Sequence, residues 1–287
     1  MNLNQIDDST KINPVGRELE YVFEDSTKDT AVLLIHGFGG KSTNWKYIAE
    51  KIKQELELPV YIPRLPGHGT NLSDFLNSSA DQWLRKSIDS YIYLKSSYKN
   101  IYAAGLSMGG LLAALIASQF EVKKLSLIAP AFFTIKKSIA FTPFIKYFIN
   151  EINNDFSLDK IEELSQNEID YHKNYSFNYY PSALAELYKL MKEARSSVNK
   201  IESPTQLILT ENDEQVATNE IKKFLNKKMG QFLKDQKTYQ KSSHVIINDV
   251  EKQRCAEDII SPGRSDGYRM FSSIMEEIKV RGEKIVR

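Results

Sequence analysis

Continuous apolar runs alternate along this chain with segments in which apolar residues recur every three or four positions. A continuous run such as 31–35 is typical of a strand covered on both faces, whereas the recurring spacing at 44–58 is typical of an amphipathic helix. The predicted strands are 18–23, 31–35, 59–62, 100–104, 124–129, 205–210 and, as the weakest, 237–240. The predicted helices are 44–58, 80–98, 108–119 and 250–260. Strands that alternate with helices indicate the α/β class, with a mostly parallel, doubly wound central sheet flanked by helices.

The alternation stops between residues 131 and 200, where the pattern is helical and rich in aromatic residues, without a clear strand. Some 70 residues between two core strands are too many for a loop. This stretch therefore predicts a small helical cap inserted over one edge of the sheet, although a separate small helical domain is the alternative. Aromatic residues at helical spacing belong to a core more often than to a ligand pocket, so they do not by themselves define a binding site.

These boundaries divide the chain into an α/β core at 1–130 and 201–260 and a helical cap, or lid, at 131–200. Ser261, Pro262 and Gly263 end the last predicted helix. The extension 261–287 is charged and helix-compatible in its later part, and the sequence does not decide how it packs.

One apolar stretch, 101–120, has the length of a membrane span. Glycines and serines interrupt it, and its first residues form a predicted strand. A buried strand, a tight turn and a buried helix explain the stretch better, so we expect no stable membrane insertion.

Charge and cysteine content limit the possible binding partners and the cellular compartment. The 38 Lys and Arg residues nearly balance the 37 Asp and Glu residues, so no overall field favours nucleic acid or an anionic membrane. Cys255 is the only cysteine, which excludes an internal disulfide and agrees with a reducing compartment. The first ten residues lack the pattern of a signal peptide. We expect a cytoplasmic protein that is a monomer or a weak homodimer and binds no nucleic acid.

The segment from Gly105 to Gly109, G-L-S-M-G, matches the pattern G-x-S-x-G. The pattern alone is common, but here a predicted buried strand precedes it and a predicted helix follows it, which is the context of a nucleophile elbow. A sharp turn of this kind lifts the hydroxyl of Ser107 above the sheet. The alternative is a buried structural serine.

A serine nucleophile requires a base, and the chain has four histidines. His244 follows the last predicted strand and precedes the last core helix, where a loop can reach the nucleophile. His36 comes too early in the chain for this architecture, His68 lies in a loop rich in proline and glycine, and His172 lies in the predicted cap. His244 is therefore the expected base.

The base requires an orienting carboxylate, and three acids follow the strand 205–210. Asp213 lies at the crest of the loop, whereas Glu211 comes directly after the strand and Glu214 begins the descent. Asp213 is the favoured acid, with a solvated loop acid or a helix N-cap as the alternative. The chain order serine, aspartate, histidine is the order of the α/β-hydrolase fold.

Acyl transfer also requires donors for the developing oxyanion. The backbone N–H of Met108 follows the nucleophile, and the N–H of Phe38 belongs to the loop H-G-F-G-G after the strand 31–35. Gly37 and Gly39 leave room for this loop to direct an N–H inward, so Gly37, Phe38 and Met108 are expected to line the substrate site. A phosphate-binding turn is the alternative, but the loop lacks the spacing G-x-G-x-x-G. No His, Cys or Asp cluster has metal-ligand spacing, so we expect neither metal nor cofactor.

Taken in order, these motifs resemble those of α/β-hydrolase carboxylesterases of the monoacylglycerol lipase type, in particular the small bacterial esterases with a compact helical cap. The motifs are H-G-F-G-G, R-L-P-G-H-G, G-L-S-M-G, N-D-E-Q-V and S-H-V-I. The resemblance implies Ser107 as nucleophile, Asp213 as acid, His244 as base, and Phe38 and Met108 as oxyanion donors. It also implies that the cap lines an acyl-binding pocket.

The resemblance covers about residues 15–260, and the extension from Ser261 departs from it. The implied function is hydrolysis of carboxylic esters with short-to-medium acyl chains, with monoacylglycerols among the candidate substrates. An acyl thioesterase and a proline iminopeptidase would use the same triad; the peptidase would also need cap acids, for which Glu151, Glu162 and Glu163 are candidates. A dehalogenase or an epoxide hydrolase would need a carboxylate in place of Ser107. A non-catalytic binding protein on this fold is a further alternative.

Overall fold

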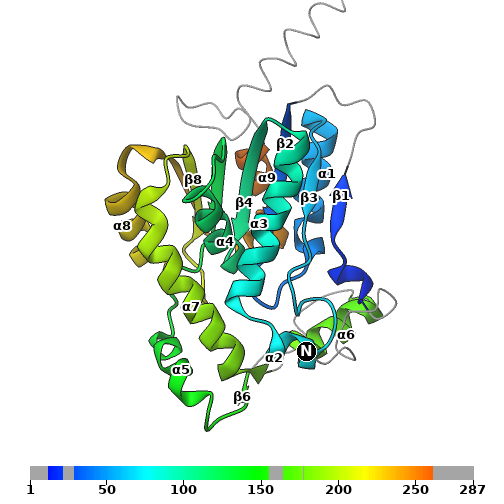
Figure 1. Cartoon of the computed structure of the whole chain (residues 1–287), viewed down its shortest axis with the longest axis vertical. Helices are drawn as coiled ribbons and strands as arrows, with labels where there is room; N and C mark the ends of the chain where they lie inside the picture. Colours follow the sequence, from blue (N-terminus) through cyan, green and yellow to red (C-terminus); the bar gives the residue numbers. More distant parts are fainter. Residues whose placement is uncertain (1–11, 22–28, 155–163, 177, 261–287) are drawn as a thin grey trace, which may run out of the picture.

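A parallel sheet forms the centre of the molecule (Figure 1), as the computed structural model shows for residues 12–21, 29–154, 164–176 and 178–260. The described residues form a seven-stranded sheet in the order β1-β3-β2-β4-β5-β8-β9. β1 is antiparallel to β3, and every other neighbouring pair is parallel. The strands are β1 (Leu19–Tyr21), β2 (Thr30–Ile35), β3 (Val60–Ile62), β4 (Asn100–Leu106), β5 (Lys124–Ile128), β8 (Thr205–Thr210) and β9 (Leu233–Tyr239). The expected α/β class and mostly parallel sheet are confirmed.

Helices cover both faces of this sheet (Figure 1). The core helices are α1 (Lys46–Leu56), α2 (Leu72–Asn77), α3 (Ala80–Ser97), α4 (Met108–Ala117), α8 (Thr218–Met229) and α9 (Lys252–Ile260). α1 packs against α9 on one face, whereas α3 packs against α4 on the other. The sheet is therefore the middle of three layers.

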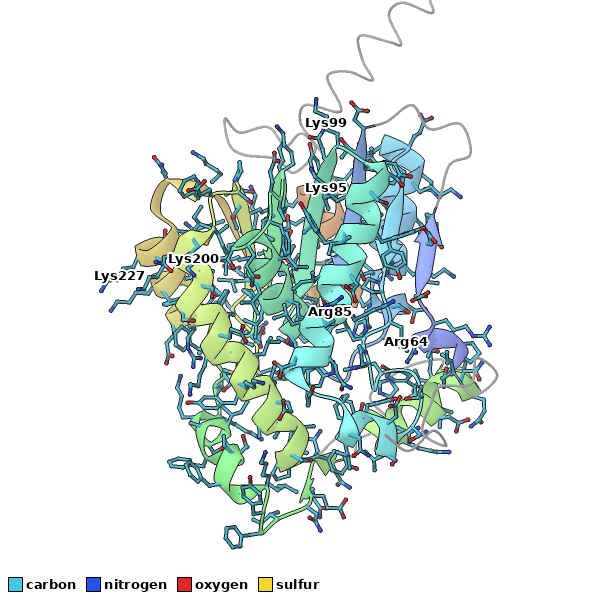
Figure 2. All side chains as sticks on the ribbon, in the orientation of Figure 1. Arg64, Arg85, Lys95, Lys99, Lys200 and Lys227 are labelled. Carbon is cyan, nitrogen blue, oxygen red and sulfur yellow. The ribbon has the colours of Figure 1, made fainter. Side chains whose placement is uncertain are left out.

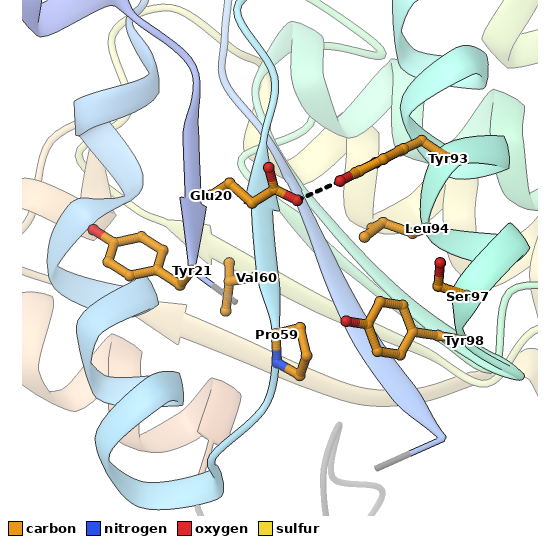
Figure 3. Close-up of a pocket in the computed structure, with 8 residues that line it drawn as sticks. All are labelled: Glu20, Tyr21, Pro59, Val60, Tyr93, Leu94, Ser97 and Tyr98. Carbon is orange, nitrogen blue, oxygen red and sulfur yellow. Dashed lines mark hydrogen bonds between the residues drawn. The ribbon is translucent and has the colours of Figure 1, made fainter. Parts of the chain in front are cut away.

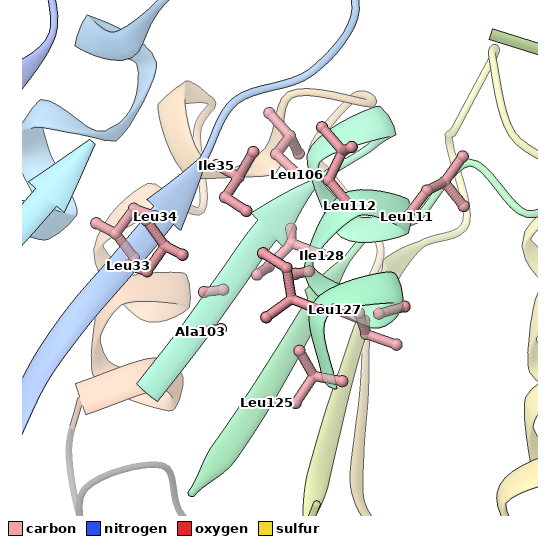
Figure 4. Close-up of a cluster of buried hydrophobic side chains, with 14 of the residues drawn as sticks. Leu33, Leu34, Ile35, Ala103, Leu106, Leu111, Leu112, Leu125, Leu127 and Ile128 are labelled. Carbon is pink, nitrogen blue, oxygen red and sulfur yellow. The ribbon is translucent and has the colours of Figure 1, made fainter. Parts of the chain in front are cut away.

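The continuous apolar runs of the sequence are the strands with no exposed face. Every residue of β2 and of β8 is buried, and so is every residue of α4. Leucines and isoleucines from β2, β4, β5 and α4 interdigitate in this core (Figure 4). The membrane-like stretch 101–120 is thus a central strand followed by a buried helix. No helix in the described parts of the chain is long and apolar enough to cross a membrane.

The strand order places a topological switch between β2 and β4. The chain passes from β2 outward to β3 and then returns to β4 on the other side of β2. The loops that leave the carboxyl ends of β2 and β4 consequently diverge, and crevices at such a point are where open α/β sheets bind ligands. The predicted oxyanion loop and the predicted elbow are these two loops.

Three parts of the fold differ from the sequence-based expectation. The weak strand predicted at 237–240 is wrong in extent, because β9 begins at Leu233. β9 is an edge strand with two exposed polar residues, Lys234 and Gln236, so it has no continuous apolar run. The helices α2 and α8 are absent from the predicted set. The region 131–200 is not free of strands, since β6 (Ile152–Asn153) and β7 (Asn178–Tyr179) form a short antiparallel pair.

The described part of the predicted cap contains helices of two kinds. They are the 3-10 helices η4 (Lys137–Phe141) and η6 (Val198–Lys200) and the α-helices α5 (Thr142–Ile145), α6 (Gln166–Tyr175) and α7 (Pro181–Ser197). α7 packs against α4 of the core, whereas α5 and β6 lie at one end of the molecule (Figure 1). The division into core and cap stays a prediction. The extension 261–287 and the candidate cap acids Glu162 and Glu163 lie outside the described residues.

The labelled basic side chains are spread over several elements (Figure 2). Lys95 and Lys99 lie at the end of the molecule away from α5, Arg85 lies along α3, and Lys200 and Lys227 lie at one side. The labelled cations therefore do not gather on a single face.

Candidate active site

Ser107 occupies a strained turn between β4 and α4. Its backbone angles are φ 55° and ψ −117°, a conformation that side-chain-bearing residues rarely adopt. Such a residue costs on the order of 1–3 kcal/mol and persists only where its surroundings hold it. Here the Ser107 N–H donates to the Ile128 carbonyl at 2.9 Å, and its own carbonyl accepts from the N–H groups of Gly110 and Ala131 at 3.0 and 3.1 Å. The turn is the strand–turn–helix arrangement that the sequence predicted.

The glycines on either side of Ser107 are sterically required. A Cβ atom at Gly105 would lie 2.0 Å from the Gly109 carbonyl oxygen. A Cβ atom at Gly109 would lie 2.1 Å from the Ile35 carbonyl oxygen, which belongs to the neighbouring strand β2. Both distances are far below van der Waals contact. Only glycine therefore fits at these two positions of the pattern G-x-S-x-G.

The predicted oxyanion loop lies beside the elbow. A Cβ atom at Gly37 would be 3.2 Å from the Ser107 Cβ atom and 3.8 Å from its hydroxyl oxygen, which places this loop next to the candidate nucleophile. Among the described residues, no protein acceptor takes a hydrogen bond from the backbone N–H of Phe38 or of Met108. Neither N–H group is engaged by the described part of the protein, and their role as oxyanion donors stays a prediction.

Two buried histidines brace the oxyanion loop. The His68 Nε2 atom accepts from the Gly39 N–H at 3.1 Å, and its Nδ1 atom contacts the Pro66 carbonyl at 3.0 Å. The His36 Nε2 atom accepts from the Leu65 N–H at 3.3 Å, and its Nδ1 atom contacts the Gly37 carbonyl at 3.0 Å. Each ring must thus be neutral, with its proton on Nδ1.

Burial supports the same protonation states. Desolvation lowers the pKa of His36 from its ordinary value to about 4, in spite of the hydrogen bond to Gly37. Desolvation, reinforced by the neighbouring His36, lowers the pKa of His68 well below its ordinary value. The two ring centroids are 5.0 Å apart. Because both Nε2 atoms already accept hydrogen bonds, neither ring has the free nitrogen that a general base requires.

Asp213 and His244 form a buried pair. The His244 Nδ1 atom is 2.8 Å from Asp213 Oδ2, and the two side chains are 5% and 0% exposed. The other carboxylate oxygen, Oδ1, accepts from the N–H groups of Gln215 at 2.9 Å and Val216 at 2.8 Å. The aspartate is therefore fixed by its own loop and in turn fixes the imidazole ring with the proton on Nδ1.

The second nitrogen of His244 is available for proton transfer. Its Nε2 atom is buried and has no hydrogen-bond partner among the described residues, so the structure does not join it to the Ser107 hydroxyl. Contacts of this kind are often long before substrate binds. The competing acids Glu211 and Glu214 are exposed, and His172 lies on α6, where its Nδ1 atom is 2.9 Å from the Ser176 hydroxyl.

Two acids that the sequence did not single out hold the loop before His244. Glu251 Oε2 accepts from the N–H groups of Lys241 at 3.0 Å and Ser242 at 2.9 Å. Asp249 Oδ2 accepts from the Ser243 N–H at 2.6 Å. Burial acts to raise the pKa of each acid, but these hydrogen bonds outweigh it and lower both pKa values. Asp249 and Glu251 follow His244 by five and seven residues, near the start of a helix. Acids are common at helix starts in general, so the sequence did not indicate that these two hold the loop.

The helix α6 packs directly on the oxyanion loop. The Tyr171 hydroxyl donates to the Gly40 carbonyl, and the Lys41 ammonium is 3.0 Å from the Glu168 carboxylate. One turn further along, the Tyr175 hydroxyl donates to the Gly67 carbonyl at 3.0 Å, in the loop that also carries His68. This helix therefore supports the same loop as the two histidines.

The acid loop also contacts the predicted cap. Thr134 and Val216 form an antiparallel bridge. Beside it, the Ile135 N–H donates to the Gln215 carbonyl at 2.9 Å, and the Ala217 N–H donates to the Phe133 carbonyl at 2.8 Å. The start of the cap segment and the loop of Asp213 are thus joined by backbone hydrogen bonds.

A cavity lies elsewhere, at the edge of the sheet (Figure 3). It has a volume of about 200 Å³ and is lined by β1, the start of β3 and the end of α3, where Glu20 accepts from the Tyr93 hydroxyl at 2.7 Å. None of the predicted site residues lines it. Among the described residues, no group of three or more His, Cys, Asp and Glu side chains is placed to hold a metal ion.

The chain is similar in sequence to a family of known hydrolases. The family described as serine aminopeptidase, S33, matches residues 26–251. A carboxylesterase of Bacillus subtilis (strain 168) is 26% identical over 233 residues, which is 80% of this chain and 91% of that protein. A thermostable monoacylglycerol lipase of Bacillus sp. (strain H-257) is 26% identical over 189 residues, which is 63% of this chain and 70% of that protein.

Solved structures give the same fold. A structure from work on the metagenome-derived lipolytic enzymes LipS and LipT has a TM-score of 0.72 at 22% identity, and the match covers 85% of this chain and 95% of that chain. A monoacylglycerol lipase of Paleococcus ferrophilus has a TM-score of 0.61 at 17% identity over 84% of this chain and 95% of that chain. At these identities the likeness concerns the fold alone.

Proposed function

This chain belongs to the serine aminopeptidase S33 family of α/β-hydrolases, and on that premise we propose that it is a carboxylesterase acting on short-to-medium acyl esters, monoacylglycerols among them. The observation that carries the proposal is the buried Asp213–His244 pair, whose Nε2 atom is free to accept a proton. An ester is favoured over a peptide because the relatives matched along most of their length are named carboxylesterase and monoacylglycerol lipase. The family description names a peptidase, so the peptide arm belongs in the test.

In the first half of the proposed reaction, the Ser107 hydroxyl oxygen attacks the ester carbonyl carbon while His244 Nε2 takes the hydroxyl proton. The negative charge that develops on the carbonyl oxygen accepts hydrogen bonds from the N–H groups of Phe38 and Met108. Removing one such donor typically costs on the order of 3 kcal/mol of transition-state stabilisation. Asp213 remains ionised and stabilises the imidazolium.

The tetrahedral intermediate then breaks its bond to the alcohol oxygen, which takes the proton from His244 Nε2 and leaves. The acyl group stays on Ser107 as an ester. A water molecule attacks this ester while His244 again takes a proton, and the second intermediate releases the carboxylic acid and restores the Ser107 hydroxyl. The side chains of Ser107 and His244 must come within hydrogen-bonding distance in this cycle, because no hydrogen bond joins them in the structure.

Glu151 bears on the peptidase alternative. A peptidase that binds a free amine needs an acid directed at the substrate. Glu151 is exposed, and its carboxylate accepts from the Asn178 side chain at 3.1 Å, in the short β6–β7 pair. That position is typical of a solvated acid, so Glu151 favours the esterase over the peptidase.

The test is a substrate series with the purified protein. It comprises p-nitrophenyl esters of increasing acyl length, a monoacylglycerol, an aminoacyl p-nitroanilide and an acyl thioester. We expect the esters to be hydrolysed fastest and Ser107→Ala to lower kcat by at least about 10⁴-fold while the circular dichroism spectrum stays unchanged. A fluorophosphonate should label Ser107. Faster cleavage of the aminoacyl amide, or an unchanged rate in Ser107→Ala, would contradict the proposal.

A further inference from the structure

One end of the molecule carries an exposed cluster of large apolar side chains. They belong to η4, α5, the turn after α5 and β6, and we call them the aromatic patch: Phe141, Phe144, Tyr147, Phe148, Ile149 and Ile152. Tyr147 is 77% exposed and Phe148 is 87% exposed, values that a side chain in a packed core does not reach. Scattered apolar residues on a surface are ordinary, but six within twelve consecutive positions indicate an interaction site.

The charges around the aromatic patch are mostly positive. Residues 136–153 contain the three cations Lys136, Lys137 and Lys146 and a single acid, Glu151. Lys137 is neutralised by Glu220 at 2.7 Å. Among the described residues Lys136 and Lys146 take part in no ion pair, and their Nζ atoms lie 5.1 Å and 5.4 Å from the ring centroids of Tyr179 and Tyr147. Lys146 thus lies beside an exposed ring of the patch, and Lys136 lies over Tyr179, which pairs with Ile152 of the patch across β6 and β7.

This combination of exposed rings and lysines favours one kind of binding partner, an anionic lipid surface. Rings that lie next to lysines suit the boundary of a lipid layer, where the apolar part enters the acyl region and the cations meet anionic headgroups. A second copy of the chain fits less well, because a two-fold interface brings the same surfaces together and would place these lysines near those of the other copy. The overall charge is +1, so the attraction would be local to this surface.

We propose that the aromatic patch docks the protein on an anionic lipid surface, with the rings of Phe144 and Phe148 in the interface and Lys136 and Lys146 against the headgroups. α5 and β6 lie at the end of the molecule where the carboxyl edge of the sheet carries Ser107 and the oxyanion loop (Figure 1). Docking would therefore bring the site toward lipid, which gives the proposed esterase access to esters held there. The docking does not require turnover, so it can be measured without the proposed function.

The experiment measures co-sedimentation of full-length Ser107→Ala protein with vesicles of phosphatidylglycerol and, separately, of phosphatidylcholine. We expect binding to phosphatidylglycerol, and a fall of about 100-fold in partitioning for Phe144→Ser/Phe148→Ser, about tenfold for each ring. Lys136→Gln/Lys146→Gln should lose about fivefold for each lysine on phosphatidylglycerol and nothing on phosphatidylcholine.

Ile92→Ser is the matched control, because Ile92 is 51% exposed on α3, away from the patch, and should leave binding unchanged. Circular dichroism and hydrolysis of a water-soluble ester on the Ser107 background verify that each variant is folded. Absence of vesicle binding, or equal binding by the Phe144→Ser/Phe148→Ser protein, would overturn the proposal. So would light scattering that shows a dimer which this double substitution converts to a monomer, since the patch would then be a subunit interface.

Discussion

Two aromatic-rich stretches of the predicted cap have opposite environments. On α6, Tyr171 is 2% exposed and Tyr175 is 9% exposed, and both hydroxyls donate to carbonyls of the loops beside the elbow. On and after α5, Phe144 is 72% exposed and Phe148 is 87% exposed. Two stretches with similar composition therefore have different roles: one packs on the oxyanion loop, and the other forms an outer surface.

The difference in burial follows from the hydrogen-bonding groups of the side chains and from the backbone carbonyls near them. The loops H-G-F-G-G and R-L-P-G-H-G are rich in glycine, so their carbonyls are not covered by side chains and need donors. A tyrosine supplies both apolar area and a hydroxyl, which suits it to such a loop. Phenylalanine has no polar group, and α5 lies away from these carbonyls. Aromatic content alone did not distinguish the two stretches, and tyrosine content does not either, since Tyr147 in the exposed stretch is 77% exposed.

The same substitution made in each stretch gives the largest contrast. We expect Tyr171→Ala to lower the free energy of unfolding by about 3–5 kcal/mol, because it removes a buried ring and leaves the Gly40 carbonyl without its donor. Phe148→Ala should change it by less than about 0.5 kcal/mol, because the ring is already in solvent. Urea denaturation of both variants beside the wild type measures the two values.

A loss of similar size in both variants would mean that Phe148 is covered in solution. A loss below about 1 kcal/mol for Tyr171→Ala would mean that α6 is not packed on the oxyanion loop as described. Either result would remove the distinction between the two stretches.

The second contrast is in pH dependence. The supported loop contains the neutral His36, whose pKa burial lowers to about 4, whereas residues 137–153 contain no histidine. The unfolded chain binds a proton at His36 near pH 6.5 and the folded chain does not, so stability is complete above that pH and falls as the pH drops toward 4. At pH 5 the loss from His36 should be about 2 kcal/mol. His68, whose pKa is also lowered, adds to it.

Urea denaturation at pH 7.5 and pH 5.0 measures this loss, and NMR titration of the histidine ring protons identifies its source. The lowered carboxylate pKa values contribute only nearer pH 4, so the interval from pH 6.5 to 5 reports the histidines. A His36 ring signal that titrated near pH 6.5 would contradict the assignment of a buried, neutral brace.

Much of the fold was predictable because its strands are buried on both faces. In β2 and β8 every residue is buried, and in β5 only Lys124 at its start is partly exposed, so the continuous runs mark these strands. β9 was mispredicted in extent because it is an edge strand. The small strands β6 and β7 were missed because two residues each carry no detectable alternation.

The candidate site was predictable where backbone geometry constrains the residue type. Gly105 and Gly109 leave no room for a Cβ atom, so the elbow shows in the sequence as G-x-S-x-G. The pairing of Asp213 with His244 followed from chain order. The residues that support the site were not predictable. Tyr171 acts on the Gly40 carbonyl, which is far away in the sequence, and Glu251 acts on the backbone N–H groups of Lys241 and Ser242. A tyrosine or an acid is common on any helix, so neither residue type indicates such a contact. Whether Ser107, Asp213 and His244 act as a triad stays a prediction.

The smallest expected effect is that of Glu168→Gln, which tests whether α6 helps to position the oxyanion loop or only stabilises the fold. Glu168 both caps α6, by accepting from the Ser165 N–H at 3.1 Å, and pairs with Lys41, which follows the oxyanion loop. Glu168→Gln keeps a side chain that can accept the capping bond and removes only the charge. Because the pair is partly exposed, we expect a loss of about 0.5–1 kcal/mol in the free energy of unfolding. If Lys41 helps to place the loop, kcat for a soluble ester should fall about twofold to fivefold with KM little changed, since an oxyanion donor acts in the transition state.

The matched control for Glu168→Gln is Asp170→Asn on the same helix. Asp170 pairs with Lys173 at 3.1 Å, and both side chains are exposed and away from the loop. Asp170→Asn should leave kcat, KM and the free energy of unfolding unchanged, because a fully exposed ion pair contributes little. Equal kinetic effects in the two variants would mean that any charge on α6 influences the site, and the specific link through Lys41 would be wrong. A fall in kcat confined to Glu168→Gln would identify α6 as a support of the oxyanion loop that the exposed stretch around α5 cannot replace.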